Sequence, residues 1–231
     1  MMLETLNQGL PQLGLELPEE TKKTLCAFGE AVVRQNEVMN LTAITAPDQV
    51  AKLHLLDSLS VLCTKDLTGK SLIDVGCGAG FPGVPLKIAC PGVQLTLLDS
   101  LGKRMTWLEQ ELQTLGIEAR CVTARAEEAV SSCRERYDFA TSRAVARLNI
   151  LLELTAPFVK VGGCVLAMKG AAAREELEES KNAIRQLGLR LEQVKDFPVD
   201  GADHSVIVLR KVSPTPSRFP RRYAKIKQQP L

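Results

Sequence analysis

The fold of this chain is decided by residues 72–83, which read LIDVGCGAGFPG. A short apolar run that contains Asp74 gives way to glycines at positions 76, 78 and 80. A buried parallel strand that breaks into a glycine-rich loop is typical of a site where the backbone closely approaches a ligand. The pattern therefore predicts a strand followed by a loop that holds a nucleotide-like cofactor.

Beyond this loop, the chain alternates between strand and helix patterns. Apolar runs predict strands at 71–75, 94–98, 118–122, 137–141, 162–168, 190–196 and 204–210, and helical spacing predicts helices at 102–115, 146–158 and 171–187. Such alternation predicts an α/β fold with a doubly wound, mostly parallel sheet. Only the short segment 198–201 joins the last two strands. They should therefore pair as an antiparallel hairpin at the sheet edge, because a parallel crossover needs about a dozen residues.

The first seventy residues follow a different pattern. Residues 18–38 predict a helix that has Pro18 near its start, and a second helix is predicted from about Pro47 to Leu62. We therefore divide the chain into an N-terminal helical cap at 1–70, an α/β domain at 71–212 and a basic tail at 213–231.

Composition narrows the class of protein. Of the 231 residues, 45% are apolar and 24% are charged, which is ordinary for a soluble globular protein. No apolar run approaches the roughly 18 residues that span a bilayer, and the start lacks the layout of a signal peptide. Seven cysteines without a C-x-x-C pair, with only two histidines, argue against disulfides and a structural metal. We expect a cytoplasmic protein with neither a metal site nor a membrane partner.

Two acids at strand ends distinguish between the possible cofactors. Asp99 ends the second predicted strand, where a carboxylate can accept hydrogen bonds from both ribose hydroxyls of a nucleoside. A dinucleotide loop would read G-x-G-x-x-G and open a helix that holds a pyrophosphate, whereas this loop reads D-x-G-x-G-x-G. Asp74 would repel a pyrophosphate but suits a cationic sulfonium and amino group, directly or through water. The loop therefore favours S-adenosylmethionine, with Gly76 and Gly78 against it.

The loop after the third strand adds two candidates. Ala126 and Glu127 follow the strand at 118–122, where methyltransferases typically contact the adenine ring. Glu128 is better explained as an acid that compensates the dipole at a helix start.

Several motifs together resemble one family, the bacterial small-subunit ribosomal RNA guanine-N7 methyltransferases, also called glucose-inhibited division protein B. The motifs are NLT at 40–42, HLLDS at 54–58, FPG at 81–83, LLDSLGKR at 97–104, SRA at 142–144 and MKG at 168–170. The resemblance spans roughly residues 20–211, and 97–104 with the FPG extension is its most specific part. The tail resembles an extension of some members but departs from it, reading Tyr223-Ala224-Lys225 where a Pro-Gly turn is usual.

This resemblance implies a class I S-adenosylmethionine-dependent methyltransferase fold, with residues 71–212 as the methyltransferase domain. It also implies cofactor contacts at Gly76, Phe81, Ala126, Glu127 and Arg143. The implied substrate is 16S ribosomal RNA of the small subunit, naked or within an assembling particle, and neither DNA nor a membrane.

The sequence agrees with guanine N7 as the methyl acceptor. N7 carries an in-plane lone pair and reacts without first losing a proton, so positioning and electrostatics matter more than a general base. Residues 142–144 stand where amine methyltransferases carry an Asp/Asn-Pro-Pro-aromatic motif, and no Pro-Cys nucleophile is present. No catalytic side chain is predicted.

The basic residues predict where RNA binds. The tail holds five of the 29 basic residues and none of the 27 acidic ones, so the remainder carries 24 against 27, a net charge of −3. A tail with this charge suggests a phosphate contact, although a disordered solubilising tail would look the same. Arg143 and Lys169 follow strand ends, where each could instead be a solvated surface charge. The substrate-binding candidates are Lys169, Arg147, Arg221 and Arg222.

Two residues of the cap join these candidates. His54 and Asp57 lie three apart on one helix face, so they either shape the substrate pocket or anchor the cap to the core. Other functions stay open, namely a methyltransferase for another substrate, a non-catalytic RNA-binding protein with this fold and, more distantly, a dinucleotide oxidoreductase. Nothing in the sequence requires more than a monomer.

Overall fold

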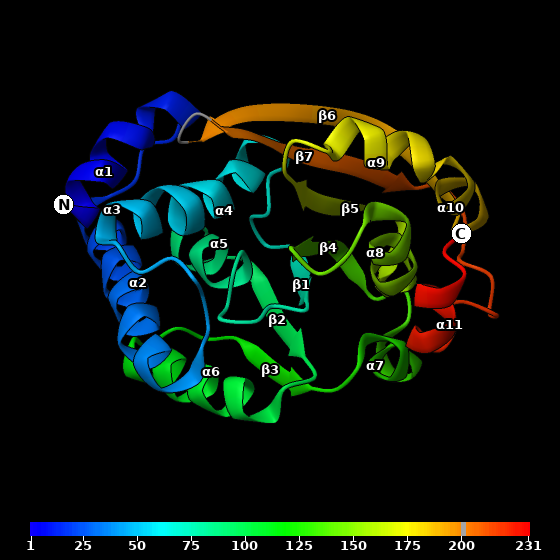
Figure 1. Ribbon diagram of the computed structural model, residues 1–231, viewed down its shortest axis with the longest axis horizontal. Helices are drawn as coiled ribbons and strands as arrows, with labels where there is room; N and C mark the ends of the chain where they lie inside the picture. The colour runs from blue at the N-terminus through cyan, green and yellow to red at the C-terminus, as the bar shows by residue number, and fades with distance from the viewer. Residues whose placement is uncertain (200–201) are drawn as a thin grey trace.

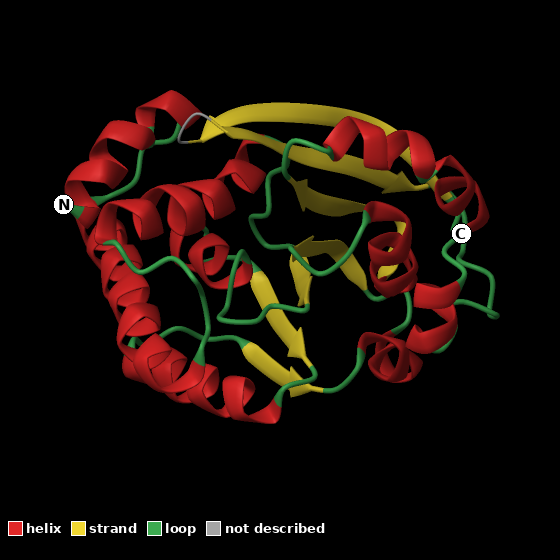
Figure 2. Ribbon diagram, in the orientation of Figure 1, coloured by secondary structure: helices red, strands yellow, loops and turns green. Residues whose placement is uncertain are grey.

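A seven-stranded sheet forms the centre of the molecule (Figures 1 and 2). The computed structural model describes residues 1–199 and 202–231, so Asp200 and Gly201 of the predicted hairpin link lie outside the described residues. The strands lie in the order β3-β2-β1-β4-β5-β7-β6. Their bounds are β1 Ser71–Val75, β2 Gln94–Asp99, β3 Arg120–Thr123, β4 Tyr137–Arg143, β5 Val159–Lys169, β6 Leu189–Val199 and β7 Ala202–Lys211.

The sheet has the predicted topology. Strands β1 to β5 pair in parallel, and β7 pairs antiparallel with both β5 and β6, which places the hairpin at one edge. Strand order reverses between β1 and β4, which is where an open α/β sheet leaves a crevice at the carboxyl ends of its strands.

Helices cover both faces of the sheet (Figure 1). The helices are α1 Met2–Gly9, α2 Glu19–Met39, α3 Pro47–Val50, α4 Asp57–Leu59, α5 Gly83–Ala89, α6 Gly102–Thr114, α7 Ala126–Cys133, α8 Leu148–Thr155, α9 Ala173–Glu179, α10 Lys181–Gln186 and α11 Tyr223–Gln228. A π-helical turn, Ala51–Leu56, joins α3 to α4, and three short 3-10 helices cover Pro11–Leu13, Ser60–Cys63 and Ala156–Phe158.

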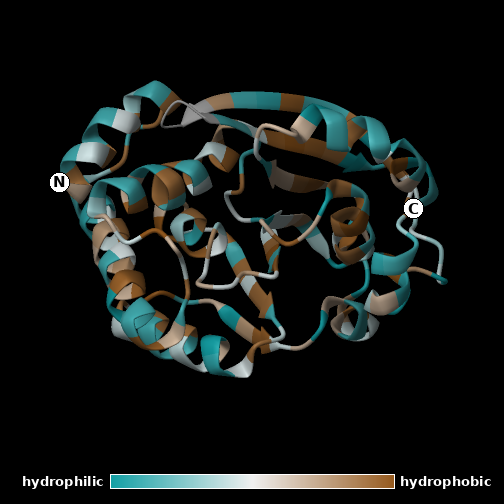
Figure 3. Cartoon of the chain, viewed as in Figure 1, coloured by the Kyte–Doolittle hydropathy of each residue, from teal (hydrophilic) through white to brown (hydrophobic). Residues whose placement is uncertain are grey.

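The alternation of side chains along each strand produces two hydrophobic cores. On β1, Leu72 is buried with the cap helices, α5 and α6, whereas Ile73 is buried on the opposite face with α8 and α10. Figure 3 shows hydrophobic and hydrophilic residues alternating along both the strands and the helices that cover them. The N-terminal cap shares the first of these cores, because Leu25 and Phe28 of α2 belong to the same buried cluster as Leu72.

One predicted helix was wrong. The segment 171–187 is divided at Ser180 into α9 and α10. The Ser180 hydroxyl donates to the carbonyl of Glu176 at 2.6 Å, a local bond that competes with regular helix geometry. Among the described helices, none is both long enough and apolar enough to cross a membrane.

Candidate functional site

A cavity of about 560 Å³ opens at the carboxyl ends of β1, β2 and β4. Its walls come from the loops after these strands and after β3, which are far apart in the sequence. All the residues predicted to bind the cofactor line it: Gly76, Gly78, Phe81, Asp99, Ala126, Glu127 and Arg143. The topology brings them together because parallel strands end at one edge of the sheet.

The glycine loop leaves room for a ligand against its backbone. Gly76 and Gly78 have φ angles of 72° and 56°, which side-chain-bearing residues rarely adopt. A Cβ on Gly76 would lie 2.5 Å from Cγ2 of Val145. A Cβ on Gly78 would meet nothing within 4 Å, so at this cavity-lining position it would take ligand space. The loop therefore needs glycine for its conformation and for its open surface.

Asp99 is placed to bind a diol. One carboxylate oxygen accepts from the Gly78 N–H at 3.0 Å, and the other accepts from the Leu101 N–H at 2.9 Å. These bonds fix the carboxylate, and each oxygen keeps a further lone pair for a ligand hydroxyl. A fixed acceptor pair beside an open glycine backbone fits the ribose of a nucleoside cofactor.

Asp74 differs from the prediction. Its side chain is fully buried and does not line the cavity. One oxygen accepts from the Gly83 N–H at 2.8 Å, the other has no partner among the described residues, and burial raises the pKa of Asp74 to about 7. A Cβ on Gly83 would lie 2.9 Å from this carboxyl. Asp74 thus ties the start of α5 to β1 beneath the loop, and of the two predicted roles, direct contact or contact through water, its burial disfavours the direct one.

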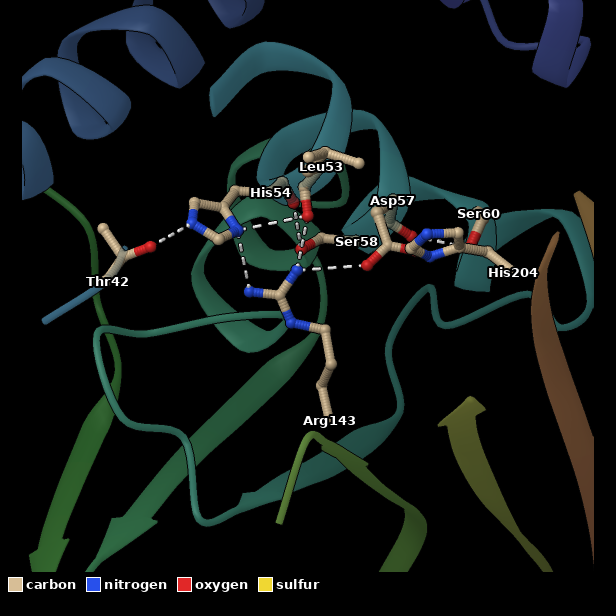
Figure 4. Close-up of polar contacts among 8 residues, drawn as sticks. All are labelled: Thr42, Leu53, His54, Asp57, Ser58, Ser60, Arg143 and His204. Atoms are coloured by element: carbon tan, nitrogen blue, oxygen red, sulfur yellow. Dashed lines mark hydrogen bonds and ion pairs between the residues drawn. The ribbon is translucent and has the colours of Figure 1, made fainter. Parts of the chain in front are cut away.

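Arg143 links the cap to the sheet (Figure 4). Its guanidinium donates to the Leu53 carbonyl at 2.8 Å, to Oδ2 of Asp57 at 3.0 Å and to Nδ1 of His54 at 3.1 Å. These are its three hydrogen bonds within the described chain. A guanidinium has five N–H donors, so two remain for a ligand.

Asp57 is buried between Arg143 and His204. Its Oδ1 is 2.9 Å from Nδ1 of His204, and this hydrogen bond raises the pKa of His204. His204 was not singled out in the sequence, because only the pairing of β7 beside β5 brings it to Asp57. His54 and Asp57 are close together, as predicted, and both contact Arg143, which connects the cap to the core.

His54 is neutral in this network. Nδ1 of His54 lies 3.1 Å from both the Arg143 guanidinium and the Leu53 carbonyl, and Nε2 lies 2.8 Å from the Thr42 hydroxyl. Burial lowers the pKa of His54 to about 4, and the charge of Arg143 acts in the same direction. The ring stacks on Phe81, with centroids 4.7 Å apart. Phe81 also contacts Phe28 of α2, at a centroid distance of 5.3 Å.

This neutral histidine predicts a pH effect on stability. Between pH 6.5 and 4 the unfolded chain binds a proton at His54 and the folded chain does not, so stability falls as pH falls. In His54→Gln we expect the loss of unfolding free energy over this range to be smaller by about 3 kcal/mol. Urea unfolding at pH 6.5 and 4 measures the difference. Equal losses in the two proteins would contradict a neutral His54.

The four substrate-binding candidates are in different surroundings. Lys169 is nearly buried and lies 2.8 Å from Glu176. Arg147 bonds Glu175 and Glu179, and Arg221 is paired with the fully buried Glu153. These three charges are balanced within the fold, and Arg222 is exposed. Their roles in RNA binding stay predictions.

A second cavity of about 650 Å³ adjoins the first. Both cavities are lined by His54, Arg143, Ala144 and Val145. Lys169 and His204 line the second cavity but not the first. Arg143 therefore stands between a site that fits a nucleoside cofactor and a neighbouring space. No group of three or more metal-ligating side chains occurs within residues 1–199 and 202–231.

The sheet, the glycine loop and the Asp99 acceptor pair define a class I methyltransferase that uses S-adenosylmethionine. A solved structure supports the fold: M. jannaschii TYW2 in complex with AdoMet matches with a TM-score of 0.56 at 12% identity, over 68% of this chain and 75% of that one.

The family described as rRNA small subunit methyltransferase G matches residues 21–205. Ribosomal RNA small subunit methyltransferase G of Alkaliphilus metalliredigens is 41% identical, over 98% of this chain and 97% of that protein. The protein of the same name from Caldanaerobacter subterraneus is 43% identical, over 99% and 98%. This chain belongs to the rRNA small subunit methyltransferase G family.

Proposed function

We propose that this protein transfers the methyl group of S-adenosylmethionine to N7 of a guanine in small-subunit ribosomal RNA. The observation that carries the proposal is the pair of adjoining cavities with Arg143 between them. The first fits the cofactor, and the second offers space for a base beside it. Family membership supports ribosomal RNA as the substrate.

The residues bind and orient the reactants. When bound, the cofactor supplies an electrophilic methyl group on a sulfonium. Asp99 and the Gly76–Gly78 backbone would hold its nucleoside part, and Phe81 lines the same cavity. Guanine N7 has a free in-plane lone pair, so the site needs no general base. The ring nitrogens of His54 contact Thr42 and Arg143 within the fold.

Arg143 has the best position to orient the base. Guanine presents N7 and O6 as acceptors on its major-groove edge. We infer that a free N–H of Arg143 donates to O6 and leaves N7 open to the methyl group. The base must be unpaired or flipped to enter the second cavity.

Incubation with labelled S-adenosylmethionine and with either naked 16S ribosomal RNA or assembled small subunits tests the function. We expect one 7-methylguanosine, located by mass mapping of nuclease fragments. Comparison of the two substrates tells which one the enzyme prefers. Methylation of a small metabolite but not of either RNA would contradict the proposal, and so would cofactor binding without methyl transfer.

We further infer that the protein acts as a cytoplasmic monomer on small-subunit ribosomal RNA, either naked or within an assembling particle. The residues that we assign to the cofactor and to the base belong to one chain. Sedimentation at the concentration of the activity assay tests the monomer.

A further inference from the structure

The C-terminal segment reaches the cofactor cavity. It folds back along the face that carries α7 and α8, and α11 lies beside them (Figure 1). Tyr223, the first residue of α11, lines the same cavity as Gly78 and Asp99. Its side chain is half-buried. The cavity wall therefore includes a residue more than 90 positions beyond the nearest predicted adenine contact, Glu127.

This segment is fixed to the core and does not form a loose tail. Phe219 and Ile226 are buried, with 3% and 0% exposure. The Glu153 carboxylate accepts from both the backbone N–H and Nε of Arg221 at 2.8 Å. Arg134 donates to the carbonyls of Thr215 and Phe219. These contacts lie on both sides of Pro220 and set the position of Tyr223.

The end of the cavity that Tyr223 reaches can be identified from the sheet order. Asp99 on β2 marks the ribose position, and Arg143 on β4 lies toward the neighbouring cavity. The turn after β3 lies on the opposite side of β2, and the Ala124 N–H donates to the Asp99 carbonyl at 3.1 Å. A nucleoside bound at Asp99 with its reactive end toward Arg143 therefore directs its base toward this turn.

Tyr223 belongs to this base end. Its backbone N–H donates to Oε1 of Glu127 at 3.4 Å, and both residues line the cavity. Aromatic rings bind nucleobases by stacking, and the ring of tyrosine offers such a face. We propose that Tyr223 is a cofactor-binding residue that covers the adenine end of the cavity, so that the C-terminal segment is part of the cofactor site. The inference rests on the proposed use of S-adenosylmethionine.

Isothermal titration of the full chain with S-adenosylmethionine and with S-adenosylhomocysteine tests this inference. We expect Tyr223→Ala to weaken both dissociation constants about tenfold. Tyr223→Phe, which keeps the ring, should recover most of the affinity, whereas Tyr223→Leu should not. Gln228→Ala, at the exposed far end of α11, is the matched control and should bind like the wild type.

The outcomes separate the two ideas. A wild-type chain that binds neither ligand would defeat the proposed function. If the wild type binds and Tyr223→Ala binds equally tightly, only the role of Tyr223 is overturned. If melting curves show that the alanine variant does not fold, Tyr223→Leu decides: normal affinity overturns the inference, and weakened affinity with a normal melting temperature supports it.

Discussion

Arg221→Ala is expected to lower the free energy of unfolding by about 3–5 kcal/mol, a large share of the total for a chain of this size. The reason is the environment of Glu153, whose side chain is fully buried. Without the guanidinium, this carboxylate keeps only the N–H of residue 221 among its described hydrogen bonds. A buried charge that loses its partner costs far more than an exposed pair contributes. Urea denaturation measures the effect.

The neighbouring arginine gives the matched control. Arg222 is exposed, so Arg222→Ala should change stability by less than about 0.5 kcal/mol. Replacing both partners, as Glu153→Leu with Arg221→Leu, should recover much of the loss because no unpaired charge is left. A loss below about 1 kcal/mol in Arg221→Ala would contradict a structural role for the pair.

The largest effect on activity is expected for Arg143→Ala. We expect kcat/KM for ribosomal RNA methylation to fall by about 100-fold, because small displacements of the reacting groups have effects of this size. Arg143 touches both cavities and holds His54 and the Leu53 carbonyl, so its loss disturbs cofactor and base together. Single-turnover methylation at saturating cofactor, together with cofactor titration, separates the two effects.

Two further variants make this test specific. Arg143→Lys keeps the charge but not the planar fork, and we expect it to restore little activity. Arg190→Ala removes an exposed arginine on β6 and should behave like the wild type. If Arg143→Ala folds and stays within threefold of wild-type kcat/KM, the role of Arg143 in positioning is wrong.

Local patterns predicted the sheet and the cofactor loop well. The mostly parallel sheet follows from alternating strands and helices, and residues after strand ends meet because parallel strands end together. The same reasoning does not locate the Asp74 carboxyl, since the pattern shows that an acid is near the loop but not on which side its carboxyl points. It also failed at Ser180, where the backbone, at φ −88° and ψ 3°, leaves regular helix geometry in a segment that apolar spacing predicts as one helix.

Charge counts were least informative about partners. The tail was predicted as a phosphate contact from its five basic residues, but Arg221 is paired with a glutamate 68 positions earlier in the chain. Residues so far apart in the sequence cannot be recognised as an ion pair from local patterns. His204 and Tyr223 were missed for the same reason, because each reaches the site only through the packing of a distant element. The FPG motif indicated the family. The structure adds why its last residue is glycine, because a Cβ on Gly83 would lie 2.9 Å from the Asp74 carboxyl.

Phe81 lies between Phe28 and His54, so the first helices of the chain and the ligand-binding loop support one another directly. Chimeras that graft the amino-terminal helices of one relative onto the sheet of another would have to carry this aromatic trio as a unit. Because of the same coupling, a newly made chain whose N-terminal helices pack in the wrong place would have a poorly shaped ligand-binding loop. Phe28, which does not line the cavity, therefore still contributes to the shape of the ligand-binding loop through its contact with Phe81.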